Sequence, residues 1–525
     1  MTRMSADLVV IGGGVTGAGV ARDAAMRGFR TILVERADIA QGTSGRFHGL
    51  LHSGARYVVA DPRSAMECAE ESAILRRIQA EAIEDTGGYF VQFAGDDPDY
   101  ADRWVESARA IGLPFEEIDV AELLRREPRV NPSAQRAMHV ADGSVDGWRL
   151  AWGAVDSAKA YGAKVLSYLE VCGIEVTDGQ ASAVRCRDRR TDAEVVIDTG
   201  FVINAAGPWA GRIAALAGCG EVEVVPGRGV MLAVGHRLVH STVNRLAVPG
   251  DGDLIVPAHT VSIIGTTDVR ADDPDQLWIP RVEVQQMLDA GERLVPGFRQ
   301  ARIVHAWAGA RPLVKDARAS GTDTRHLSRG MVILDHASRD GVRGLLTVIG
   351  GKLTTYRLMA KGLVDLMCEQ LGDPRPCTTD TEPVPGSESG HTHQVSQRLR
   401  DRENDRLTEQ LLCECELVTR RMFTDALHEN PDASLDDLRR QLRLGMGSCQ
   451  GGFCSTRAAA VACAEGERSA AEASDALRLF LSNRWLGLWP ILQGDQLRQA
   501  VLDNWIISGT LDAEHLPVAS SGSRR

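Results

Sequence analysis

A glycine-rich turn between a predicted strand and a predicted helix constrains the fold of this chain more than any other feature. The apolar run at residues 7–11 predicts a buried strand, the alanine-rich residues 15–27 predict a helix, and residues 31–35 predict a second strand. The turn after the first strand has the spacing G-x-G-x-x-G, and its three spaced glycines are Gly12, Gly14 and Gly17. Strand, glycine turn, helix and strand together predict a βαβ unit of the Rossmann type.

The chemistry of this unit is that of a dinucleotide site. Glycines let the backbone approach a pyrophosphate closely, and the helix N-terminus offers N–H donors and the positive end of the helix dipole. Glu35 ends the second strand 18 residues after Gly17, where its carboxylate can accept a hydrogen bond from a ribose hydroxyl. A glycine pattern alone can be a structural turn, but the acidic residue in register favours a dinucleotide. The pattern does not separate FAD from NAD.

The length, charge and polarity of the chain narrow the remaining possibilities. A chain of 525 residues exceeds one ordinary domain. Its formal net charge of −12 argues against a nucleic-acid partner, because a phosphate backbone attracts a basic surface. No stretch approaches the roughly 20 consecutive apolar residues of a membrane helix, and residues 1–7 are too polar and too short for a signal peptide. We therefore expect a cytoplasmic protein that clusters its positive charge wherever it holds an anion.

The positions of two later glycine turns resemble a known family. Ala206-Gly207 and Gly350-Gly351 each follow a predicted apolar strand. With the N-terminal turn, this layout resembles the FAD-dependent oxidoreductases that include D-amino-acid oxidase, glycine oxidase and glycerol-3-phosphate dehydrogenase. The resemblance implies an α/β fold (α+β overall), with a discontinuous Rossmann-like FAD-binding domain and an inserted substrate domain built on an antiparallel sheet. The FAD contacts that it implies are Gly12, Gly14, Gly17, Glu35, Arg36, Gly42, Thr43, Ser44, Ala206, Gly207, Gly350, Gly351, Lys352, Leu353 and Thr354.

Three further segments resemble the glycerol-3-phosphate dehydrogenases that use FAD. They are residues 52–57 (His-Ser-Gly-Ala-Arg-Tyr), residues 265–268 with 308–313, and residues 350–357 (Gly-Gly-Lys-Leu-Thr-Thr-Tyr-Arg). The last is the most specific of them. The resemblance implies that sn-glycerol 3-phosphate is oxidised to dihydroxyacetone phosphate, with hydride passing from C2 to the flavin N5 while a base takes the hydroxyl proton.

The resemblance also assigns roles to basic residues in these segments. Arg311 and Lys352 are expected to hold the phosphate, and Arg56 is expected to lie near the reacting carbon. This agrees with the chemistry, because a buried phosphate dianion requires fixed cations that donate hydrogen bonds. The residues expected to bind the substrate are Arg56, Tyr57, Arg311, Lys352 and Thr354.

His52 is the candidate general base, and it completes the expected catalytic group with Arg56, Arg311 and Lys352. A single histidine can equally be a satisfied core residue, so the residue type alone leaves both roles open. A second histidine of the single-subunit respiratory relatives is missing, because residues 228–231 read Arg-Gly-Val-Met in place of Lys-Gly-Ser-His. We carry no role across at that position.

Four of the eleven cysteines are clustered near the C-terminus. Cys413 and Cys415 are followed, after 33 intervening residues, by Cys449 and Cys454. Four thiolates suit either a [2Fe–2S] cluster or tetrahedral zinc. The other seven cysteines are scattered, and we expect them to be buried or inert thiols.

The cysteine segment resembles the small helical [2Fe–2S] domain of bacterioferritin-associated ferredoxin. The wider spacing between Cys449 and Cys454 departs from that ferredoxin and resembles instead the A-subunit family of anaerobic glycerol-3-phosphate dehydrogenases. This second resemblance covers the whole chain. It implies partner subunits B and C, menaquinone as the final electron acceptor, and a peripheral location at the inner face of the cell membrane.

Composition and motifs together predict the domain boundaries. We expect an FAD-dependent oxidoreductase part at residues 1–380, a linker, a [2Fe–2S] domain, a C-terminal helical region and a disordered tail. Within the first part the FAD-binding pieces are expected at about 1–60, 145–225 and 330–375, and the substrate-domain pieces at about 61–144 and 226–329. The remaining ranges are 381–408 for the linker, 409–465 for the cluster domain, 466–517 for the helical region and 518–525 for the tail.

Two other functions stay open at this point. One is an FAD-dependent oxidase or dehydrogenase of amino acids or 2-hydroxy acids, which would need an arginine for a carboxylate but has no need of the pair Arg311 and Lys352. The other is a non-catalytic flavin redox sensor or assembly subunit whose cysteines bind zinc. Trp485, Trp489 and Trp505 lie in the last helical stretch, where we expect helix core and keep a docking surface as the alternative.

Overall fold

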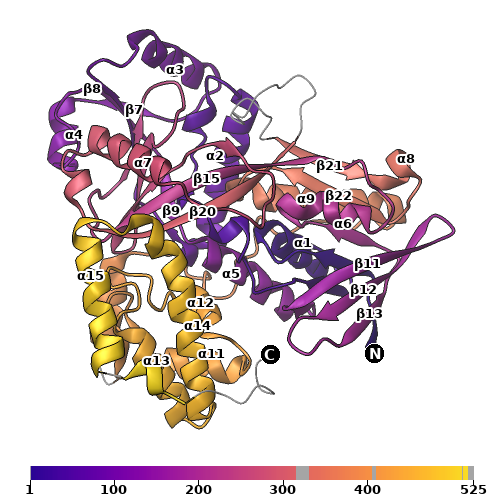
Figure 1. Ribbon diagram of the computed structural model, residues 1–525. Helices are drawn as coiled ribbons and strands as arrows, with labels where there is room; N and C mark the ends of the chain where they lie inside the picture. Colours follow the sequence, from indigo (N-terminus) through magenta and orange to yellow (C-terminus); the bar gives the residue numbers. More distant parts are fainter. Residues whose placement is uncertain (1, 315–329, 405–408, 511, 518–525) are drawn as a thin grey trace.

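A computed structural model describes residues 2–314, 330–404, 409–510 and 512–517 (Figure 1). The expected tail at 518–525 lies outside the described residues, as do residues 315–329 of the expected substrate domain and 405–408 of the expected linker. Among the described residues, no helix is long and apolar enough to cross a membrane.

The expected βαβ unit is present and belongs to a six-stranded sheet. Strand β2 (Leu8–Ile11), helix α1 (Val15–Met26) and strand β3 (Thr31–Val34) match the predicted elements within one residue at each end. The sheet has the order β10-β3-β2-β14-β22-β21, and only β21 runs antiparallel to its neighbour. The other strands are β10 (Lys164–Leu166), β14 (Val202–Asn204), β22 (Leu345–Gly350) and β21 (Met331–Asp335).

Both faces of this sheet are buried, which explains why its strands are continuous apolar runs. Leu8 and Val10 enter a core shared with the helices α1, α5 (Gly147–Ala160) and α9 (Tyr356–Leu371). Val9 and Ile11 point the other way, into a core shared with a four-stranded sheet of order β1-β13-β12-β11. That sheet comprises β1 (Thr2–Ser5), β13 (Glu194–Asp198), β12 (Gln180–Asp188) and β11 (Leu169–Thr177).

A larger, mainly antiparallel sheet lies beside the six-stranded one (Figure 1). It is built from two separated stretches of chain, and its core includes Val230, Leu232 and Met287. Its strands are β6 (Gly88–Phe93), β7 (Glu116–Ile118), β8 (Ala134–Val140), β15 (Val224–Val234), β16 (Thr242–Arg245), β17 (Leu254–Ala258), β18 (Val261–Gly265), β19 (Val269–Arg270) and β20 (Ile303–Val314). The elements around the two sheets are α2 (Pro62–Ile78), α3 (Pro98–Ala110), α4 (Val120–Arg126), α6 (Ala210–Ala215), α7 (Arg281–Leu294), α8 (His336–Asp340), β4 (Leu50–Leu51), β5 (Ile83–Glu84) and β9 (Gly143–Val145).

The C-terminal residues form a helical module with a core of its own, which we call the cysteine module (residues 409–510). Figure 1 shows its orange and yellow helices gathered against one side of the body. Leu412, Phe423, Leu438 and Phe480 are among the residues of its core. Its elements are β23 (Leu411–Cys413), β24 (Val418–Thr419), α11 (Arg420–Glu429), α12 (Leu435–Leu442), α13 (Cys454–Ala464), α14 (Ala470–Leu488) and α15 (Gly494–Asn504), and α10 (Val395–Asn404) precedes it.

The structure confirms the mixed α/β fold class and corrects one expectation. Trp485, Trp489 and Trp505 are 45%, 68% and 68% exposed, so the prediction that they form helix core is wrong. The helices bury their opposite faces instead, for example through Leu477 and Phe480 on α14.

The ring of His305 on β20 lies where the cysteine module packs against the body, and its protonation makes the free energy of unfolding depend on pH. A side chain at Gly487 of α14 would clash with this ring, so helix and strand meet there. Burial, with Arg439 and Arg484 nearby, lowers the pKa of His305 to about 3. The unfolded chain therefore binds a proton at His305 below pH ~6.5, whereas the folded chain binds it only below about pH 3.

We therefore expect the free energy of unfolding to fall by on the order of 2 kcal/mol from this residue between pH 7 and pH 5. Urea denaturation at both pH values measures it. The variant His305→Asn should flatten the dependence, whereas His515→Asn, at an exposed histidine, should leave it unchanged. An equal slope in both variants would contradict the assignment to His305.

Candidate active site

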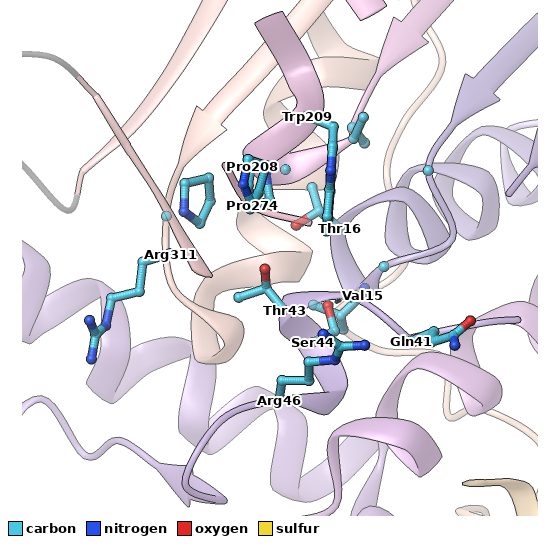
Figure 2. Close-up of a pocket in the computed structure, with 18 of the residues that line it drawn as sticks. Val15, Thr16, Gln41, Thr43, Ser44, Arg46, Pro208, Trp209, Pro274 and Arg311 are labelled. Carbon is cyan, nitrogen blue, oxygen red and sulfur yellow. Dashed lines mark hydrogen bonds between the residues drawn. The ribbon is translucent and has the colours of Figure 1, made fainter. Parts of the chain in front are cut away.

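A cavity of about 830 Å³ opens at the C-terminal ends of the parallel strands. Its wall includes Gly12, Glu35 and Ala206, which follow β2, β3 and β14, and Gly350, the last residue of β22. Figure 2 shows Pro208 and Trp209 on one side of the cavity and Thr43, Ser44 and Arg46 on another. Ligands of open α/β sheets bind in such crevices at the carboxyl ends of the strands.

The glycine turn is shaped by close packing of backbone on backbone. Gly12 has a φ of 109°, and a Cβ there would lie 2.7 Å from the carbonyl oxygen of Ala205. A Cβ at Gly17 would lie 1.9 Å from the carbonyl oxygen of Gly12. Gly12 and Gly14 line the cavity, whereas Gly17 lies in the first turn of α1, beneath the glycine turn, and lets α1 pack closely against it. Among the expected cofactor contacts, Gly17 acts through packing alone.

Gly17→Ala is therefore expected to weaken retention of a dinucleotide at least about tenfold, because the added methyl group must displace the turn that cradles the pyrophosphate. The ratio of bound flavin to protein, measured by absorbance after gel filtration, tests this. Gly220→Ala is the matched control, since a Cβ at Gly220 meets no atom within 4 Å. Equal flavin content in the two variants would contradict the proposed role of Gly17.

Glu35 is held at the mouth of the turn by backbone donors. The carboxylate accepts hydrogen bonds from the N–H of Gly13 at 2.7 Å and from the N–H of Ala37 at 2.9 Å. Burial raises the pKa of Glu35, and these N–H groups oppose the rise. The side chain lines the cavity, and each oxygen keeps a lone pair for a ribose hydroxyl.

The remaining expected cofactor contacts surround this end of the cavity. Ser44 Oγ already accepts a hydrogen bond from the N–H of Val15 at 2.9 Å, and Thr43 Oγ1 donates to the carbonyl oxygen of Ala310 at 2.6 Å. The Arg36 guanidinium lies 4.4 Å from the ring of Trp209. The expected contacts that line the cavity are Gly12, Gly14, Glu35, Arg36, Gly42, Thr43, Ser44, Ala206, Gly207, Gly350, Gly351, Lys352, Leu353 and Thr354. The donor set, the glycine cradle and the size of the cavity fit a dinucleotide.

The expected substrate residues divide into two groups. His52, Tyr57, Arg311, Lys352 and Thr354 line the same cavity as the glycine turn. Arg56 does not line it, because the guanidinium is paired with Asp253 at 2.9 Å and lies with it inside the protein. The structure therefore brings together five of the six residues expected to bind the substrate or to act on it, and separates Arg56 from them.

Lys352 and Arg311, the two cations expected to hold the phosphate, are anchored by neighbouring polar groups. Lys352 Nζ donates to Ser64 Oγ at 2.8 Å and lies 4.7 Å from the centre of the Tyr57 ring. Arg311 donates to the carbonyl oxygen of Thr267 at 3.2 Å and lies 3.4 Å from the carboxylate of Asp268.

Three cavity residues were missed by the sequence analysis. The ring of His48 lies 5.9 Å from that of His52, so two imidazoles share this part of the wall. Arg46 extends into the cavity, and burial lowers the pKa of its guanidinium. Trp209 faces it from the other side (Figure 2). The signal available for Arg46 and His48 was their place in the loop between Ser44 and His52.

The four C-terminal cysteines meet although they come from two segments. The thiol of Cys454 lies within hydrogen-bonding distance of those of Cys413 and Cys449, and the thiol of Cys415 lies within that distance of Cys449. The contact with Cys454 lowers the pKa of Cys413 to about 7. A Cβ at Gly447 would lie 2.2 Å from that of Cys415, so only glycine fits beside the group.

Backbone N–H groups also point at these sulfur atoms. Donors come from Gly445 and Glu416 to Cys413, from Cys449 to Cys415, and from Gly451 and Phe453 to Cys449. Such donors stabilise thiolate sulfur, whether bare or bound to a metal.

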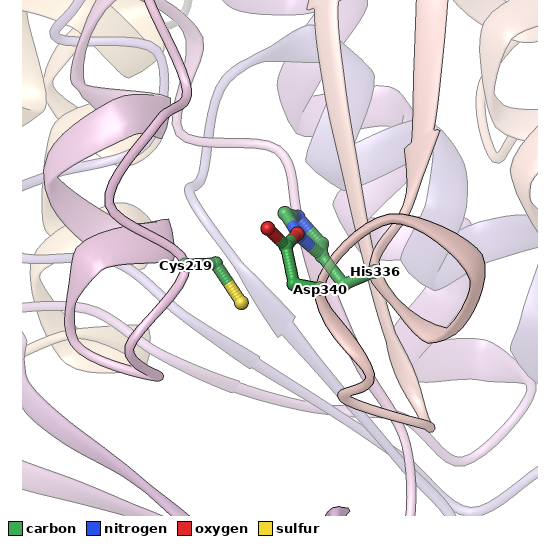
Figure 3. A group of neighbouring side chains, drawn as sticks. All are labelled: Cys219, His336 and Asp340. Atoms are coloured by element: carbon green, nitrogen blue, oxygen red, sulfur yellow. The ribbon is translucent and has the colours of Figure 1, made fainter.

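A different group of potential ligands comprises Cys219, His336 and Asp340, which lie close together (Figure 3). None of the three lines the cavity. Among the described residues it is the one group of three such side chains whose ligand atoms all lie within 4.8 Å of one another. His336 contacts Asp340 through Nδ1 at 2.5 Å and Thr347 through Nε2 at 2.8 Å. Burial raises the pKa of Cys219 to about 11, so its thiol stays protonated beside Asp340. The hydrogen bond between His336 and Thr347 connects α8 to β22.

Comparison with known proteins places the chain in a family. A family model described as FAD dependent oxidoreductase matches residues 7–357. The A subunit of the anaerobic glycerol-3-phosphate dehydrogenase of Escherichia coli K12 is 40% identical, over 97% of each chain. The A1 subunit of the anaerobic glycerol-3-phosphate dehydrogenase of Haloferax volcanii is 37% identical, over 99% of this chain and 92% of the relative.

A solved structure extends the likeness to the fold. The glycerol-3-phosphate dehydrogenase from Bacillus halodurans, complexed with FAD, has a TM-score of 0.59 at 23% identity. The alignment covers 97% of this chain and 89% of that one. The present chain therefore belongs to the FAD dependent oxidoreductase family and, within it, to the family of anaerobic glycerol-3-phosphate dehydrogenase A subunits.

Proposed function

We propose that this chain is an FAD-dependent glycerol-3-phosphate dehydrogenase that oxidises sn-glycerol 3-phosphate to dihydroxyacetone phosphate. The observation that carries the proposal is one cavity with a dinucleotide-binding turn at one end and the cations Arg311 and Lys352 elsewhere on its wall. A substrate carrying a phosphate dianion suits two anchored cations, whereas the carboxylate of an amino acid requires one. The close relatives named for this activity support the same conclusion.

The residues of the chain have defined tasks in this reaction. FAD, when bound, supplies N5 as the acceptor of the hydride from C2. Arg311 and Lys352 hold the phosphate and so fix C2 in place, which is where positioning lowers the barrier most. His52 is the proposed base for the hydroxyl proton, and its neighbour His48 is a second candidate. Arg56 lies outside the cavity, where it is paired with Asp253.

We further propose that the four cysteines hold a [2Fe–2S] cluster. Tetrahedral zinc at about 2.3 Å from each sulfur would place all four sulfur atoms about 3.8 Å apart. Among these four described cysteines, no three sulfur atoms all lie within 4.8 Å of one another. The thiols instead form an open row, a line of neighbouring pairs in the order Cys413, Cys454, Cys449 and Cys415. An open row of paired thiols with backbone donors fits a cluster of two irons better.

The proposed cluster would pass electrons singly to partner subunits B and C, with menaquinone as the final acceptor and the enzyme peripheral to the inner face of the cell membrane. The relatives that are named as A subunits support the presence of further subunits. Metal analysis and electron paramagnetic resonance of the reduced protein test the cluster. Two irons and two sulfides per chain are expected, and one zinc with no iron would overturn this assignment.

The substrate is tested by an absorbance spectrum of the anaerobic protein before and after glycerol 3-phosphate is added. Bleaching of the flavin band at about 450 nm, which is a property of the cofactor itself, is expected. Bleaching by lactate or an amino acid but not by glycerol 3-phosphate would leave the fold in place and overturn the substrate. A flavin that no substrate reduces would favour the non-catalytic alternative.

A further inference from the structure

The two last long helices expose an unusual amount of apolar surface. We call it the apolar face; it comprises the outward sides of α14 and α15, their connection, and the cysteine loop beside them. Trp489 and Trp505 are both 68% exposed, and Leu486 is 72% exposed. The members of the apolar face are Phe453, Leu479, Trp485, Leu486, Trp489, Leu497, Val501, Leu502 and Trp505.

These side chains are exposed although both helices are firmly packed on their other sides. On α14, Leu477 and Phe480 enter the module core. On α15, Gln496 and Asp503 are buried and face inward. Arg484 and Asp503 form a buried ion pair at 2.6 Å that joins the two helices. The outward side of α15 carries three exposed apolar residues, Leu497, Val501 and Leu502, beside an exposed ion pair of Arg498 and Asp495. An apolar surface of this kind, next to a polar rim, is typical of a contact outside the chain.

The apolar face borders the cysteines directly. The Arg484 guanidinium that pairs with α15 also donates to the carbonyl oxygen of Cys449 at 3.4 Å. A Cβ at Gly452 would lie 3.4 Å from the carboxylate of Asp503, so α15 lies on the loop from Cys449 to Cys454. Phe453, inside this loop, is 50% exposed. A protein seated on the apolar face would therefore lie against the cysteine group.

The size and composition of the face fit a stable protein interface. Nine side chains, four of them aromatic, together expose on the order of 1,000 Å², and a standard interface needs about 800 Å² per partner. Tryptophan is the residue most enriched at binding hot spots. A membrane surface is a poorer fit, because helices that lie on lipid are rich in Lys and Arg. Helices α14 and α15 contain no lysine, and each of their three arginines is paired with an aspartate of the same two helices.

We propose that the apolar face is the docking surface for the subunit that accepts electrons from the cysteine-held group. The occupant is a protein that carries a one-electron redox centre, and this inference rests on the proposed function. The step across the interface moves one electron at a time, oxidising the cysteine-held group and reducing the centre of the partner. Docking against Phe453 and α15 would bring the two centres close while excluding water.

The test uses the full chain, produced together with the proposed partner subunits B and C of its own organism. Complex formation is measured by light scattering after size exclusion, with binding affinity from titration. The double variant Trp489→Ser/Trp505→Ser is expected to weaken the complex at least about 100-fold, since each hot-spot tryptophan accounts for a tenfold change or more. Trp278→Ser, at a tryptophan 69% exposed outside the module, is the matched control and should bind like the unaltered chain.

The rate of flavin bleaching by glycerol 3-phosphate should be equal in all three proteins, and the absorbance of the cysteine-held group confirms that the module is folded. If the double variant binds the partner subunits as tightly as the control, the proposal is overturned. It is also overturned if the unaltered chain uses this face only to form a dimer, or only to bind anionic phospholipid vesicles. A chain whose flavin glycerol 3-phosphate cannot bleach would refute the proposed function, whatever the complex does.

Discussion

Replacing Arg311 with methionine is expected to lower kcat/KM for glycerol 3-phosphate by a factor of about 10²–10³, the cost of truncating one member of a desolvated charge pair. Methionine keeps the length and the apolar stem of arginine but cannot donate to a phosphate. Arg311 is fixed on β20, whose register places it opposite Gly227 of β15, and its guanidinium is oriented by Thr267 and Asp268. Steady-state kinetics with an artificial electron acceptor measures the effect.

Two companion variants separate loss of the phosphate contact from general damage. Arg311→Lys keeps the charge and loses the planar fork, so it should fall between the parent and the methionine variant. Arg270→Met changes an exposed arginine on the neighbouring β19 and should leave kcat/KM within about twofold of the parent. Flavin content should stay the same in all of them. An unchanged kcat/KM in Arg311→Met would show that the phosphate lies elsewhere in the cavity.

The parts of this architecture that depend on local pattern were predictable from the sequence. The βαβ unit could be predicted, because its strand, glycine turn and helix are consecutive and Glu35 follows at a fixed distance. The four cysteines were recognisable by type and spacing. Their meeting in space depends on tertiary packing at Gly447, which no spacing rule reveals.

The parts that depend on distant partners were not predictable. Arg56 lies in a motif that resembles a substrate site, but its position outside the cavity is set by Asp253, 197 residues further along the chain. Trp489 and Trp505 have the apolar character of helix core, yet a helix with apolar residues on its outward side has the same local composition as a buried one. Sequence gives the composition of a helix face, and only the surrounding layers decide whether the face is covered.

The attachment of the cysteine module to the body depends on a buried ion-pair network. Arg443 donates to Asp146 at 2.8 Å and to Glu416 at 2.9 Å, and all three side chains are almost fully buried. Asp146 begins α5 and also accepts hydrogen bonds from the N–H groups of Trp148 and Arg149. Burial alone would raise the pKa of Asp146, but Arg443 and Arg149 hold it below its usual value. Arg443 thus connects Asp146 at the start of α5 with Glu416, the residue that follows Cys415.

Arg443→Met is expected to lower the free energy of unfolding of the cysteine module by about 3–5 kcal/mol, because it leaves Asp146 and Glu416 buried without their shared cation. Urea denaturation followed by the absorbance of the cysteine-held group measures this loss. Bleaching of the flavin by glycerol 3-phosphate should remain, since Arg443 does not line the cavity. We expect electrons to leave the flavin more slowly, because a loosened module no longer holds its cysteines at a fixed distance.

The control variants decide whether charge or packing is responsible. Arg420→Met removes an exposed pair with Glu465 and should change the free energy of unfolding by less than about 1 kcal/mol. The triple variant Arg443→Met/Asp146→Asn/Glu416→Gln removes all three charges and should recover most of the loss, because buried ion pairs cost nearly as much to desolvate as they return. Asparagine at residue 146 still begins α5 as an N-cap. If the triple variant is no more stable than Arg443→Met, the guanidinium acts through its packing, and the network is not what attaches the module.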